Sequence, residues 1–485
     1  MKSSVKRSLY STVMAALAAG LYPLLFYVSN NYTLVNSWSH LVYFISVFLL
    51  APVAIFCLLK VVASLSIFEK IEKFVLPFLN LFVFLFFLKT ALYAGFQIWM
   101  VLGIGVVALL YTFFFYKYFL KVVVFQVLLA VVASFYLIPN SIDQFQYSKE
   151  WMQQPDAIAA IQFKKKPNVY LIQPDGYVNF SELKKGFYNV KERKLEDFLQ
   201  QENFTLYPNF RSNYASTLSS NSSLFTMKHH YYLNTNKFTE MLDARNIIIG
   251  ENPVVTIFKN NGYTTNFLAE RPYLLANRPK MGYDSSNYVN KDVGYITTGL
   301  KEKKDVIEPL RQFLENQGEQ PAFHFIEIFE PGHITVDEKN HEGTEKEREN
   351  WISKLEDTNK KLLEIVSLLK EKDPGGIIII LADHGGFVGF QYMHQAYEKT
   401  QDRDKLYSIF GANLAIYWPE EIPEAHEHIQ TSVNVFRILF SYLSEDSALL
   451  HTLQEEGSYL PILYGARKGI YKVIDDTGKI VFMKR

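Results

Sequence analysis

The apolar character of the first 140 residues is the feature that most constrains what this chain can fold into. Five apolar stretches lie there, and each is close to the ~20 residues that an α-helix needs to cross a bilayer. They run over residues 9–28, 39–59, 74–93, 98–116 and 122–138, with short polar breaks between them. We therefore expect a five-span transmembrane domain over residues 1–139, followed by a linker and a domain of ordinary mixed composition.

The distribution of Lys and Arg predicts how these spans are oriented. Positive residues precede the first stretch, follow the second and lie between the fourth and the fifth, whereas the loop 29–38 has no charge. They are Lys2, Lys6, Arg7, Lys70, Lys73, Lys117 and Lys121. An odd number of spans then places everything after Pro139 on the outer face of the cytoplasmic membrane. A cleaved signal peptide is disfavoured, because four more spans follow and no small-residue cleavage site ends the first.

Polar residues within and just after the spans give two further expectations. Lys89, in the third stretch, faces the helix bundle or snorkels outward, and the absence of any other polar pathway argues against a transporter. Residues 140–166 form a linker. Its amphipathic part, 151–163, is either a helix along the membrane surface or a plain linker helix.

Charge and cysteine content argue against a nucleic-acid-binding protein and against a fold held together by internal disulfides. Lys plus Arg and Asp plus Glu number 49 each, so no net field points to nucleic acid as a partner. The single cysteine, Cys57, lies in an apolar run and cannot form an internal disulfide. More than 300 residues follow the spans, enough to bury a large core without one.

From Pro167 onward, strand-like runs alternate with helical patterns. The expected strands are 168–173, 264–269, 322–328 and 376–382, and the expected helices are 190–201, 252–260, 305–316 and 348–370. This alternation predicts an α/β domain over residues 167–485 with a mostly parallel, doubly wound sheet. The segment after Leu450 is expected to be β-rich. In such sheets the active site lies beyond the carboxyl ends of the strands.

Potential metal ligands follow three of the expected strands. Asp175 and Gly176 come after the first strand, and Asp383 and His384 after the strand 376–382. The third strand, 322–328, is followed by Glu330 and His333. A lone Asp-Gly is usually a turn, but carboxylates and imidazoles gathered at one sheet edge suit a divalent ion. We favour Zn²⁺ or Mn²⁺ over Mg²⁺ or Ca²⁺.

Four segments of the chain carry a family resemblance. Residues 167–443 resemble the sulfatase-like branch of the alkaline-phosphatase superfamily, through the segments NVYLIQPDGY, HFIEIFEPGH, LADHGG and SVNVFRILFSYL. Five spans before an outer catalytic domain is also the layout of lipoteichoic-acid synthases and phosphoethanolamine transferases. Those enzymes use a metal-bound threonine as nucleophile. The resemblance implies that Asp175, Asp383, His384 and a threonine hold one metal ion.

The nucleophile falls in a stretch rich in Ser and Thr, residues 211–220. By position, the resemblance assigns it to Thr217. Ser216 and Ser219 remain alternatives, and so does the reading of this stretch as a polar loop whose hydroxyls cap a helix.

Three further residues are expected at the substrate. The resemblance places His333 and His394 where they bind phosphoryl oxygens or protonate the leaving group. Arg211 can pair with a phosphate through two hydrogen bonds. The alternative for Arg211 and for His394 is an ordinary surface side chain.

Departures from the family narrow the chemistry. No Cys/Ser-x-Pro-x-Arg motif is present, so sulfate-ester hydrolysis through an aldehyde is not expected. Lipoteichoic-acid synthases have Glu where this chain has Asp175, and Glu330 with His333 is only a partial second metal set. We expect transfer or hydrolysis of a phosphoglycerol or phosphoethanolamine group from a lipid donor, with a lipid or envelope glycan as acceptor. The alternatives are a non-catalytic envelope binding or signalling protein, and a sulfate-ester hydrolase.

Overall fold

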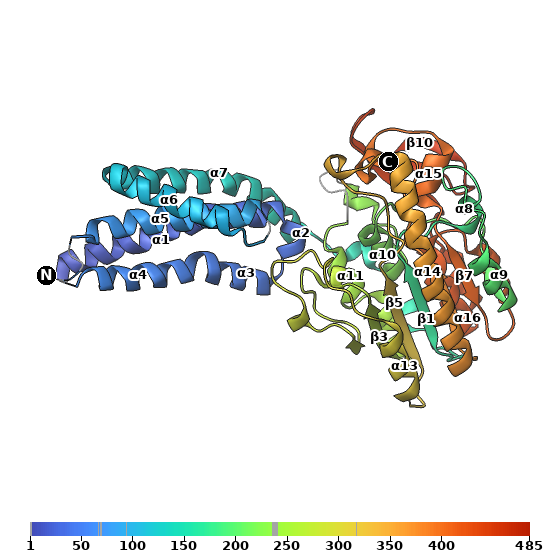
Figure 1. Ribbon diagram of the computed structural model, residues 1–485. Helices are drawn as coiled ribbons and strands as arrows, with labels where there is room; N and C mark the ends of the chain where they lie inside the picture. Colours follow the sequence, from blue (N-terminus) through green and yellow to red (C-terminus); the bar gives the residue numbers. More distant parts are fainter. Residues whose placement is uncertain (1, 66, 68–69, 94, 235–240, 317) are drawn as a thin grey trace. The chain divides into compact units, whose positions relative to one another are not determined.

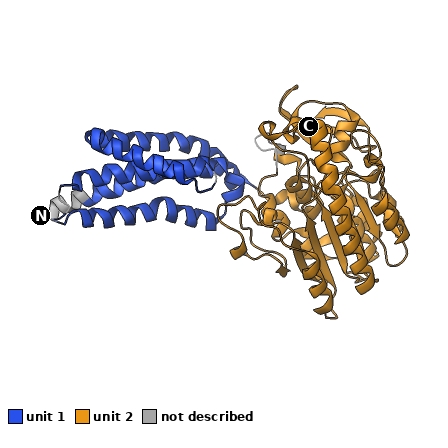
Figure 2. Ribbon diagram, in the orientation of Figure 1, with its two compact units in different colours: residues 1–147 blue, residues 148–485 orange. Residues whose placement is uncertain are grey.

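The computed structural model describes residues 2–65, 67, 70–93, 95–234, 241–316 and 318–485. The chain divides into two compact units, residues 1–147 and residues 148–485 (Figures 1 and 2). The first unit is helical where it is described, and the second is built on a seven-stranded sheet.

Seven α-helices are described in the first unit. They are α1 (Lys2–Asn30), α2 (Tyr32–Val35), α3 (Trp38–Ile45), α4 (Ala51–Ala63), α5 (Glu72–Leu92), α6 (Ile98–Phe115) and α7 (Phe119–Gln146). Four helical runs are long and apolar enough to cross a membrane, judged by length and composition: Leu9–Asn30, Trp38–Ala63, Glu72–Leu92 and Ile98–Gln146. The last run has 49 residues and contains α6 and α7, joined by a 3₁₀ turn at Tyr116–Tyr118. The fourth and fifth expected spans therefore fall in one helical run, which is long enough for two crossings.

Orientation in the membrane stays a prediction. The side chains of residues 2–8, among them Lys2, Lys6 and Arg7, lie outside the described part of the chain.

A buried polar pair holds three helices of the first unit together. The Asn80 side chain of α5 donates to Gln126 Oε1 of α7 at 2.8 Å and to the Ala15 carbonyl of α1 at 2.8 Å. Gln126 Nε2 donates back to Asn80 Oδ1 at 3.0 Å. Single amides within long apolar stretches can serve as interhelical hydrogen-bonding groups, and this pair bonds α1, α5 and α7 to one another. Lys89 itself is buried and donates to the Gly95 carbonyl.

The expected linker helix over 151–163 is absent. This segment contains two 3₁₀ turns, Glu150–Met152 and Ile158–Ala160, separated by Pro155, which has no N–H to donate. The Phe163 N–H donates to Asn261 Oδ1 at 2.7 Å. Two of the apolar residues whose spacing suggests a helix, Ile158 and Phe163, are buried in the second unit without forming one.

The main sheet of the second unit has the strand order β2-β7-β6-β1-β5-β3-β4. Its strands are β1 (Val169–Pro174), β2 (Phe204–Leu206), β3 (Thr264–Ala269), β4 (Ser285–Ser286), β5 (Ala322–Ile328), β6 (Ile377–Leu381) and β7 (Leu414–Tyr417). β1 lies at the centre and pairs in parallel with β5 and β6. Among these strands β7 alone runs antiparallel to its neighbours. The expected mostly parallel α/β architecture is confirmed.

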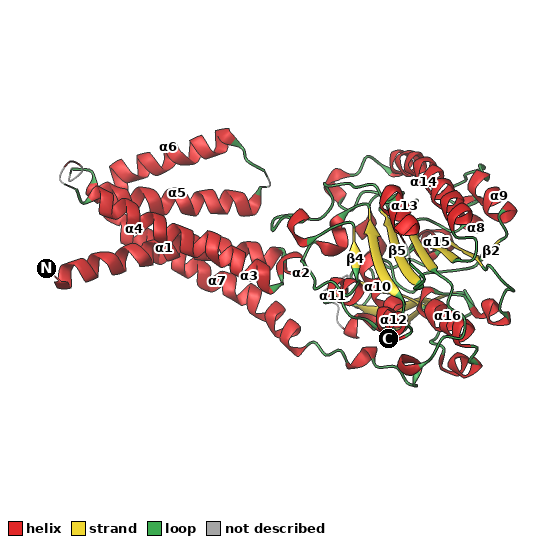
Figure 3. Cartoon of the chain, turned by 90° about the horizontal axis from the view of Figure 1, so that it is seen from below, coloured by secondary structure: helices red, strands yellow, loops and turns green. Residues whose placement is uncertain are grey.

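Helices cover both faces of this sheet (Figure 3). The α-helices of the second unit are α8 (Phe180–Leu183), α9 (Lys194–Gln201), α10 (Thr217–Thr226), α11 (Ala244–Ile249), α12 (Pro253–Asn260), α13 (Ile307–Asn316), α14 (Thr344–Lys372), α15 (Arg403–Phe410) and α16 (Val435–Ser444). Alternate residues of β5 point to opposite faces. Phe323 stacks on Phe258 of α12 at 4.3 Å, whereas His324 meets Phe313 of α13.

The chain ends in a separate antiparallel sheet of order β10-β9-β8. Its strands are β8 (Ser458–Ile462), β9 (Gly469–Ile474) and β10 (Ile480–Lys484). This agrees with the β-rich ending expected after Leu450.

Candidate metal centre and substrate cavity

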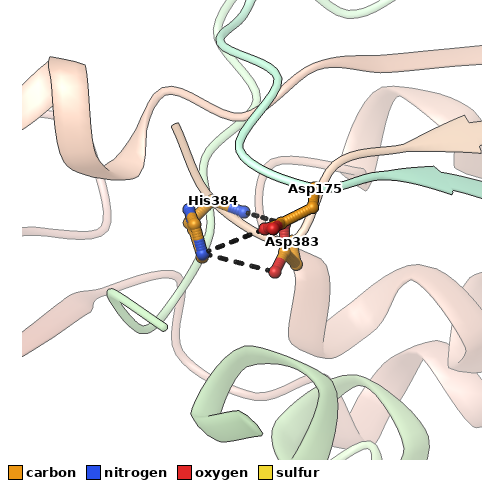
Figure 4. Close-up of side chains that lie close together, drawn as sticks. All are labelled: Asp175, Asp383 and His384. Atoms are coloured by element: carbon orange, nitrogen blue, oxygen red, sulfur yellow. Dashed lines mark hydrogen bonds and ion pairs between the residues drawn. The ribbon is translucent and has the colours of Figure 1, made fainter. Parts of the chain in front are cut away.

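Two carboxylates and an imidazole meet at the carboxyl edge of the main sheet. Asp175 follows β1, and Asp383 and His384 follow β6. Because β1 and β6 are parallel neighbours, residues just beyond their ends lie side by side (Figure 4). His384 Nε2 lies 3.4 Å from Asp175 Oδ1 and 3.4 Å from Asp383 Oδ2. The ligand atoms of all three buried residues lie within 4.8 Å of one another.

Glycines allow the backbone to pass close to this cluster. Gly176, after Asp175, has φ +63°, and a Cβ there would lie 2.0 Å from the Gly332 carbonyl oxygen. The Gly332 N–H donates to the Asp175 carbonyl at 2.8 Å, which fixes the turn. A Cβ on Gly386 would lie 2.2 Å from Trp351 Nε1, which donates to the Gly332 carbonyl at 2.9 Å.

Hydrogen bonds orient two of the ligands for a cation. His384 Nδ1 lies 2.8 Å from the Gly385 carbonyl oxygen, so Nδ1 carries the proton and the lone pair of Nε2 faces the carboxylates. Asp383 Oδ1 accepts the N–H groups of Gly176 at 3.1 Å and His384 at 3.0 Å. Asp383 Oδ2 is buried and has no hydrogen-bond partner among the residues that the structure describes. A bare carboxylate oxygen beside an imidazole lone pair fits a divalent metal ion.

Negative charge is concentrated around these ligands. Burial, followed by the Asp383 and Glu327 carboxyls, raises the pKa of Asp175 well above its usual value. Glu327, near the end of β5, is buried, and within the described part of the chain neither of its carboxyl oxygens has a hydrogen-bond partner. Burial and the nearby Asp383 and Glu270 likewise raise the pKa of Glu327. A cation at this point would relieve the repulsion between these groups.

Thr217 completes the cluster from the first residue of α10. Its Oγ1 lies 3.4 Å from Asp175 Oδ1 and 3.4 Å from His384 Nε2. The neighbouring hydroxyls are engaged elsewhere: Ser216 Oγ donates to Ser219 Oγ at 3.1 Å, and Ser219 Oγ accepts the Met241 N–H at 3.0 Å. The geometry therefore favours Thr217 over both alternative hydroxyls.

A pair of amides holds α10 against β1. Gln173 Nε2 donates to Asn221 Oδ1 at 2.9 Å, and Asn221 Nδ2 donates to Gln173 Oε1 at 2.7 Å. Asn221 is one helical turn after Thr217, and Gln173 is two residues before Asp175. This reciprocal pair sets the position of the threonine relative to the carboxylate.

A cavity of about 380 Å³ opens over the cluster and contains both expected histidines. His333 Nδ1 lies 2.7 Å from the Ile334 carbonyl oxygen, so its Nε2 is the free nitrogen. Burial lowers the pKa of His333 to about 4, so its ring is neutral near pH 7. His394 is half-exposed, and its Nδ1 lies 3.6 Å from Asp337 Oδ1.

Arg211 is not in this cavity, which corrects its expected role at the substrate. The side chain is buried and donates to the carbonyls of Glu456 at 3.0 Å and Asp475 at 3.3 Å. It ties the segment before α10 to the C-terminal sheet. Proximity to Thr217 in the sequence does not give the direction of a side chain.

Two cations that the sequence analysis did not identify line the cavity, Arg271 and Lys354. Arg271 comes two residues after β3, so the rule applied to the other strand ends would have found it. Lys354 lies on the long helix α14, where no local signal distinguishes it from the other lysines. The cavity therefore offers positive charge from two elements.

Glu330 lines the cavity but does not complete a second metal site. In the described part of the chain, Asp175, Asp383 and His384 form the one group of three or more acidic, His or Cys residues that could hold a metal ion. Glu330 instead lies 3.4 Å from Lys303 Nζ. The geometry fits one metal ion.

Comparison with known proteins identifies the family. The family model described as Sulfatase matches residues 184–444, more than half of the 485 residues. The chain belongs to the sulfatase family, in the sulfatase-like branch of the alkaline-phosphatase superfamily. It is a sulfatase-like enzyme and, with its apolar helical runs, a membrane protein. No curated protein sequence matches the chain.

Several solved structures are similar to it. The zinc complex of the C-terminal periplasmic domain of EcEptC from Escherichia coli has 12% identity and a TM-score of 0.43, over 65% of this chain and 94% of that one. Lipoteichoic acid synthase LtaP from Listeria monocytogenes has 12% identity and a TM-score of 0.42, over 67% and 90%. Lipooligosaccharide phosphoethanolamine transferase A from Neisseria meningitidis has 12% identity and a TM-score of 0.40, over 90% and 95%.

Proposed function

We propose that this protein transfers or hydrolyses a phosphate-type ester from a lipid donor, in a metal-dependent reaction with Thr217 as nucleophile. The observation that carries the proposal is the position of Thr217 Oγ1, 3.4 Å from both Asp175 Oδ1 and His384 Nε2. A hydroxyl at that point adds a fourth donor to the two carboxylates and the imidazole.

Asp175, Asp383, His384 and Thr217 would hold one divalent ion, with Zn²⁺ or Mn²⁺ favoured by the mixed oxygen and nitrogen donors. Such an ion supplies two effects when bound: it lowers the pKa of the threonine hydroxyl, and it offsets charge on the phosphoryl oxygens. The N–H groups of the first turn of α10 add positive potential, because no side chain caps this helix.

The residues then divide the reaction into two displacements. Thr217 gives up its proton to solvent, and its oxygen attacks phosphorus while the bond to the leaving oxygen breaks. His394 protonates that leaving oxygen. In the second step the free Nε2 of His333 takes a proton from an acceptor hydroxyl or from water. The resulting oxygen attacks the phospho-threonine and the bond from phosphorus to the threonine oxygen breaks. That oxygen then regains a proton from solvent, which restores the Thr217 hydroxyl.

Several features support a lipid donor and an envelope acceptor. The proposed arrangement is a transmembrane domain over 1–139, a linker over 140–166 and an extracytoplasmic catalytic domain over 167–485. An active site tethered to the cytoplasmic membrane meets lipid substrates at high effective concentration. Arg271 and Lys354 in the cavity favour an anionic group such as phosphoglycerol or phosphoethanolamine.

The family match keeps sulfate esters as the second candidate substrate. Against it stands the absence of a Cys/Ser-x-Pro-x-Arg motif, together with a threonine at the metal cluster. A threonine cannot be oxidised to the aldehyde hydrate that those sulfatases use, so a phosphate-type ester is favoured.

The test uses the full chain purified in detergent, as wild type, Thr217→Ala and Ser222→Ala. Ser222 is a matched control, because it lies on the same helix and donates only to the Leu218 carbonyl at 2.7 Å. We expect wild type and Ser222→Ala to cleave bis-p-nitrophenyl phosphate and Thr217→Ala to be inactive, with p-nitrophenyl sulfate untouched by all three. Cleavage of the sulfate ester would support the second candidate. A metal-free, inactive wild type would support a non-catalytic binding protein.

A further inference from the structure

Exposed apolar side chains cluster in one loop of the second unit. Three of the six large apolar side chains that are exposed in its described part lie within twelve residues: Val289 (48%), Ile296 (54%) and Leu300 (38%). The other three are Ile422, Tyr464 and Met483, which come from separate segments. We call residues 289–304, between β4 and α13, the rim loop. Clustered exposed apolar groups usually mark a contact surface.

The rim loop is held firmly to the segment that follows β3. Arg271 donates to the Leu300 carbonyl, and Arg278 donates to the Val293 carbonyl while its guanidinium lies 4.2 Å from the Tyr295 ring. The apolar side chains thus point outward from an anchored backbone.

Close backbone packing adds to this anchoring. Gly299 has φ +75°, and a Cβ there would lie 2.5 Å from the Pro272 carbonyl oxygen. The Lys304 N–H donates to the Glu270 carbonyl at 2.9 Å. The end of the loop is therefore fixed at the carboxyl edge of the sheet.

The rim loop also borders the substrate cavity. Leu300 lines the cavity together with Arg271, Thr217 and His384. Lys303, three residues later, lies 3.4 Å from Glu330, another lining residue. Whatever covers the loop therefore lies next to the route by which substrate reaches Thr217.

The charge of the rim loop points to an anionic surface. Residues 289–304 contain four lysines against Asp292 and Glu302. Asp292 is paired with Lys304 at 2.8 Å, whereas Lys291 and Lys301 are exposed. Apolar side chains interleaved with lysines are typical of segments that lie in the interface of anionic bilayers.

We propose that the rim loop is a lipid-docking surface, which places Val289 and Ile296 at the boundary between headgroups and acyl chains of an anionic bilayer. A lipid headgroup can then enter the cavity without its chains leaving the membrane. This proposal rests on the proposed function only where it identifies the molecule that enters the substrate cavity as a lipid headgroup. The contact with lipid is independent of catalysis.

The single cysteine makes a direct test practical. In a Cys57→Ala background, Ile296→Cys is labelled with the fluorophore NBD and the full chain is reconstituted into vesicles that contain doxyl-labelled lipids. Ile422→Cys is the matched control, an apolar position in the same unit that is 47% exposed and outside the rim loop. We expect a blue shift and about twofold quenching at position 296 but not at 422, stronger with phosphatidylglycerol than with phosphatidylcholine alone. Equal signals at both positions would overturn the proposal, and so would a shift at 296 that needs a second copy of the chain rather than lipid.

Two further variants separate this proposal from the proposed function. We expect Val289→Ser/Ile296→Ser to turn over a lipid donor in vesicles at least about fivefold more slowly, with unchanged turnover of soluble bis-p-nitrophenyl phosphate. Lys291→Gln/Lys301→Gln should remove the preference for phosphatidylglycerol in the quenching experiment. If the wild-type protein proves catalytically inactive but the label at position 296 is still quenched by lipid, lipid docking stands and the proposed function alone is contradicted.

Discussion

Thr217 Oγ1 lies 3.4 Å from His384 Nε2, although the two residues are 167 positions apart in the chain. Thr217 is the first residue of α10, and His384 lies three residues after the end of β6. His384 Nε2 carries a lone pair, because the other ring nitrogen, Nδ1, donates a hydrogen bond to the Gly385 carbonyl. Both groups also lie 3.4 Å from Asp175 Oδ1, and this arrangement supports the proposal of one cation and one nucleophile at this point.

The amide pair between β1 and α10 should act by positioning the nucleophile. In Asn221→Ala, the Gln173 amide loses both of its bonds and α10 is free to shift. We expect kcat for bis-p-nitrophenyl phosphate to fall at least about tenfold with little change in KM, since misplacement of a reacting group slows the chemical step. Metal content should stay near that of wild type. A loss of folding without this split between kcat and KM would show that the pair is only structural.

Removal of a metal ligand should separate metal binding from catalysis. We expect Asp383→Asn to lose the bound ion, because Asp383 Oδ2 has no hydrogen-bond partner among the described residues, and to lose activity with it. His394→Ala should keep about one equivalent of metal while turnover falls by about 10² or more. Elemental analysis of both purified variants gives the answer. Full metal content in Asp383→Asn would contradict the assigned ligands.

Glu327 should tune the metal through charge rather than through contact. Burial, followed by the neighbouring Asp383 carboxylate, raises the pKa of Glu327, and the Glu327 carboxyl is one of the charges that raise the pKa of the buried Asp175. Glu327→Gln removes one negative charge at nearly constant volume. We expect metal affinity to fall about 10- to 100-fold, as is typical for groups just outside the ligand shell. Titration with a chelator-buffered metal measures this, and an unchanged affinity would argue against the electrostatic role.

His324 should make the second unit sensitive to acid. Burial lowers its pKa from 6.5 to about 3, so the unfolded chain takes up a proton below pH 6.5 that the folded protein refuses. Stability is therefore full above pH 6.5 and is lost as the pH falls toward 3. Between pH 7 and pH 5 we expect this group to cost about 2 kcal/mol of unfolding free energy.

The variant that tests this pH effect is His324→Phe. It keeps an aromatic ring next to Tyr170, whose ring centroid lies 4.9 Å from that of His324 in the wild-type structure. Denaturant unfolding measures the free energy of unfolding of wild type and variant at pH 7 and at pH 5. Between these pH values the variant should lose about 2 kcal/mol less than wild type. His428→Phe, at an exposed position, controls for the loss of one histidine. Equal slopes for wild type and His324→Phe would be inconsistent with a neutral buried imidazole.

Much of the fold follows from local patterns. The expected strands 264–269 and 322–328 coincide with β3 and β5. The strand expected at 376–382 contains β6 (Ile377–Leu381), because a continuous apolar run marks a strand that is buried on both faces. β2 and β7 were not expected, since three or four residues at a sheet margin carry too short a pattern to be distinguished from a loop. The helix expected at 151–163 does not form. The buried apolar residues of this segment, Ile158 and Phe163, lie within the second unit without the spacing of a helix.

The site was partly accessible from the sequence for one physical reason. Parallel strands bring residues that follow them to one edge, so Asp175, Asp383 and His384 could be grouped without coordinates. Arg211 is expected at the substrate because it lies beside Thr217 in the sequence, but closeness along the chain does not give the direction of a side chain, and Arg211 bonds to Glu456 and Asp475 instead. Lys354 reaches the cavity from a helix, where only the tertiary packing reveals it.

The most direct test of the central claim is to find the phosphoryl group on the enzyme. The full chain, loaded with metal, is mixed with bis-p-nitrophenyl phosphate, quenched in acid and digested with trypsin, which releases residues 212–228 as one peptide. We expect a p-nitrophenyl phosphoryl adduct on Thr217, moved to the introduced serine in Thr217→Ser and absent in Thr217→Ala. Wild-type turnover with the adduct on Ser216, or with no adduct on this peptide under burst conditions, would contradict the assignment of Thr217 as nucleophile.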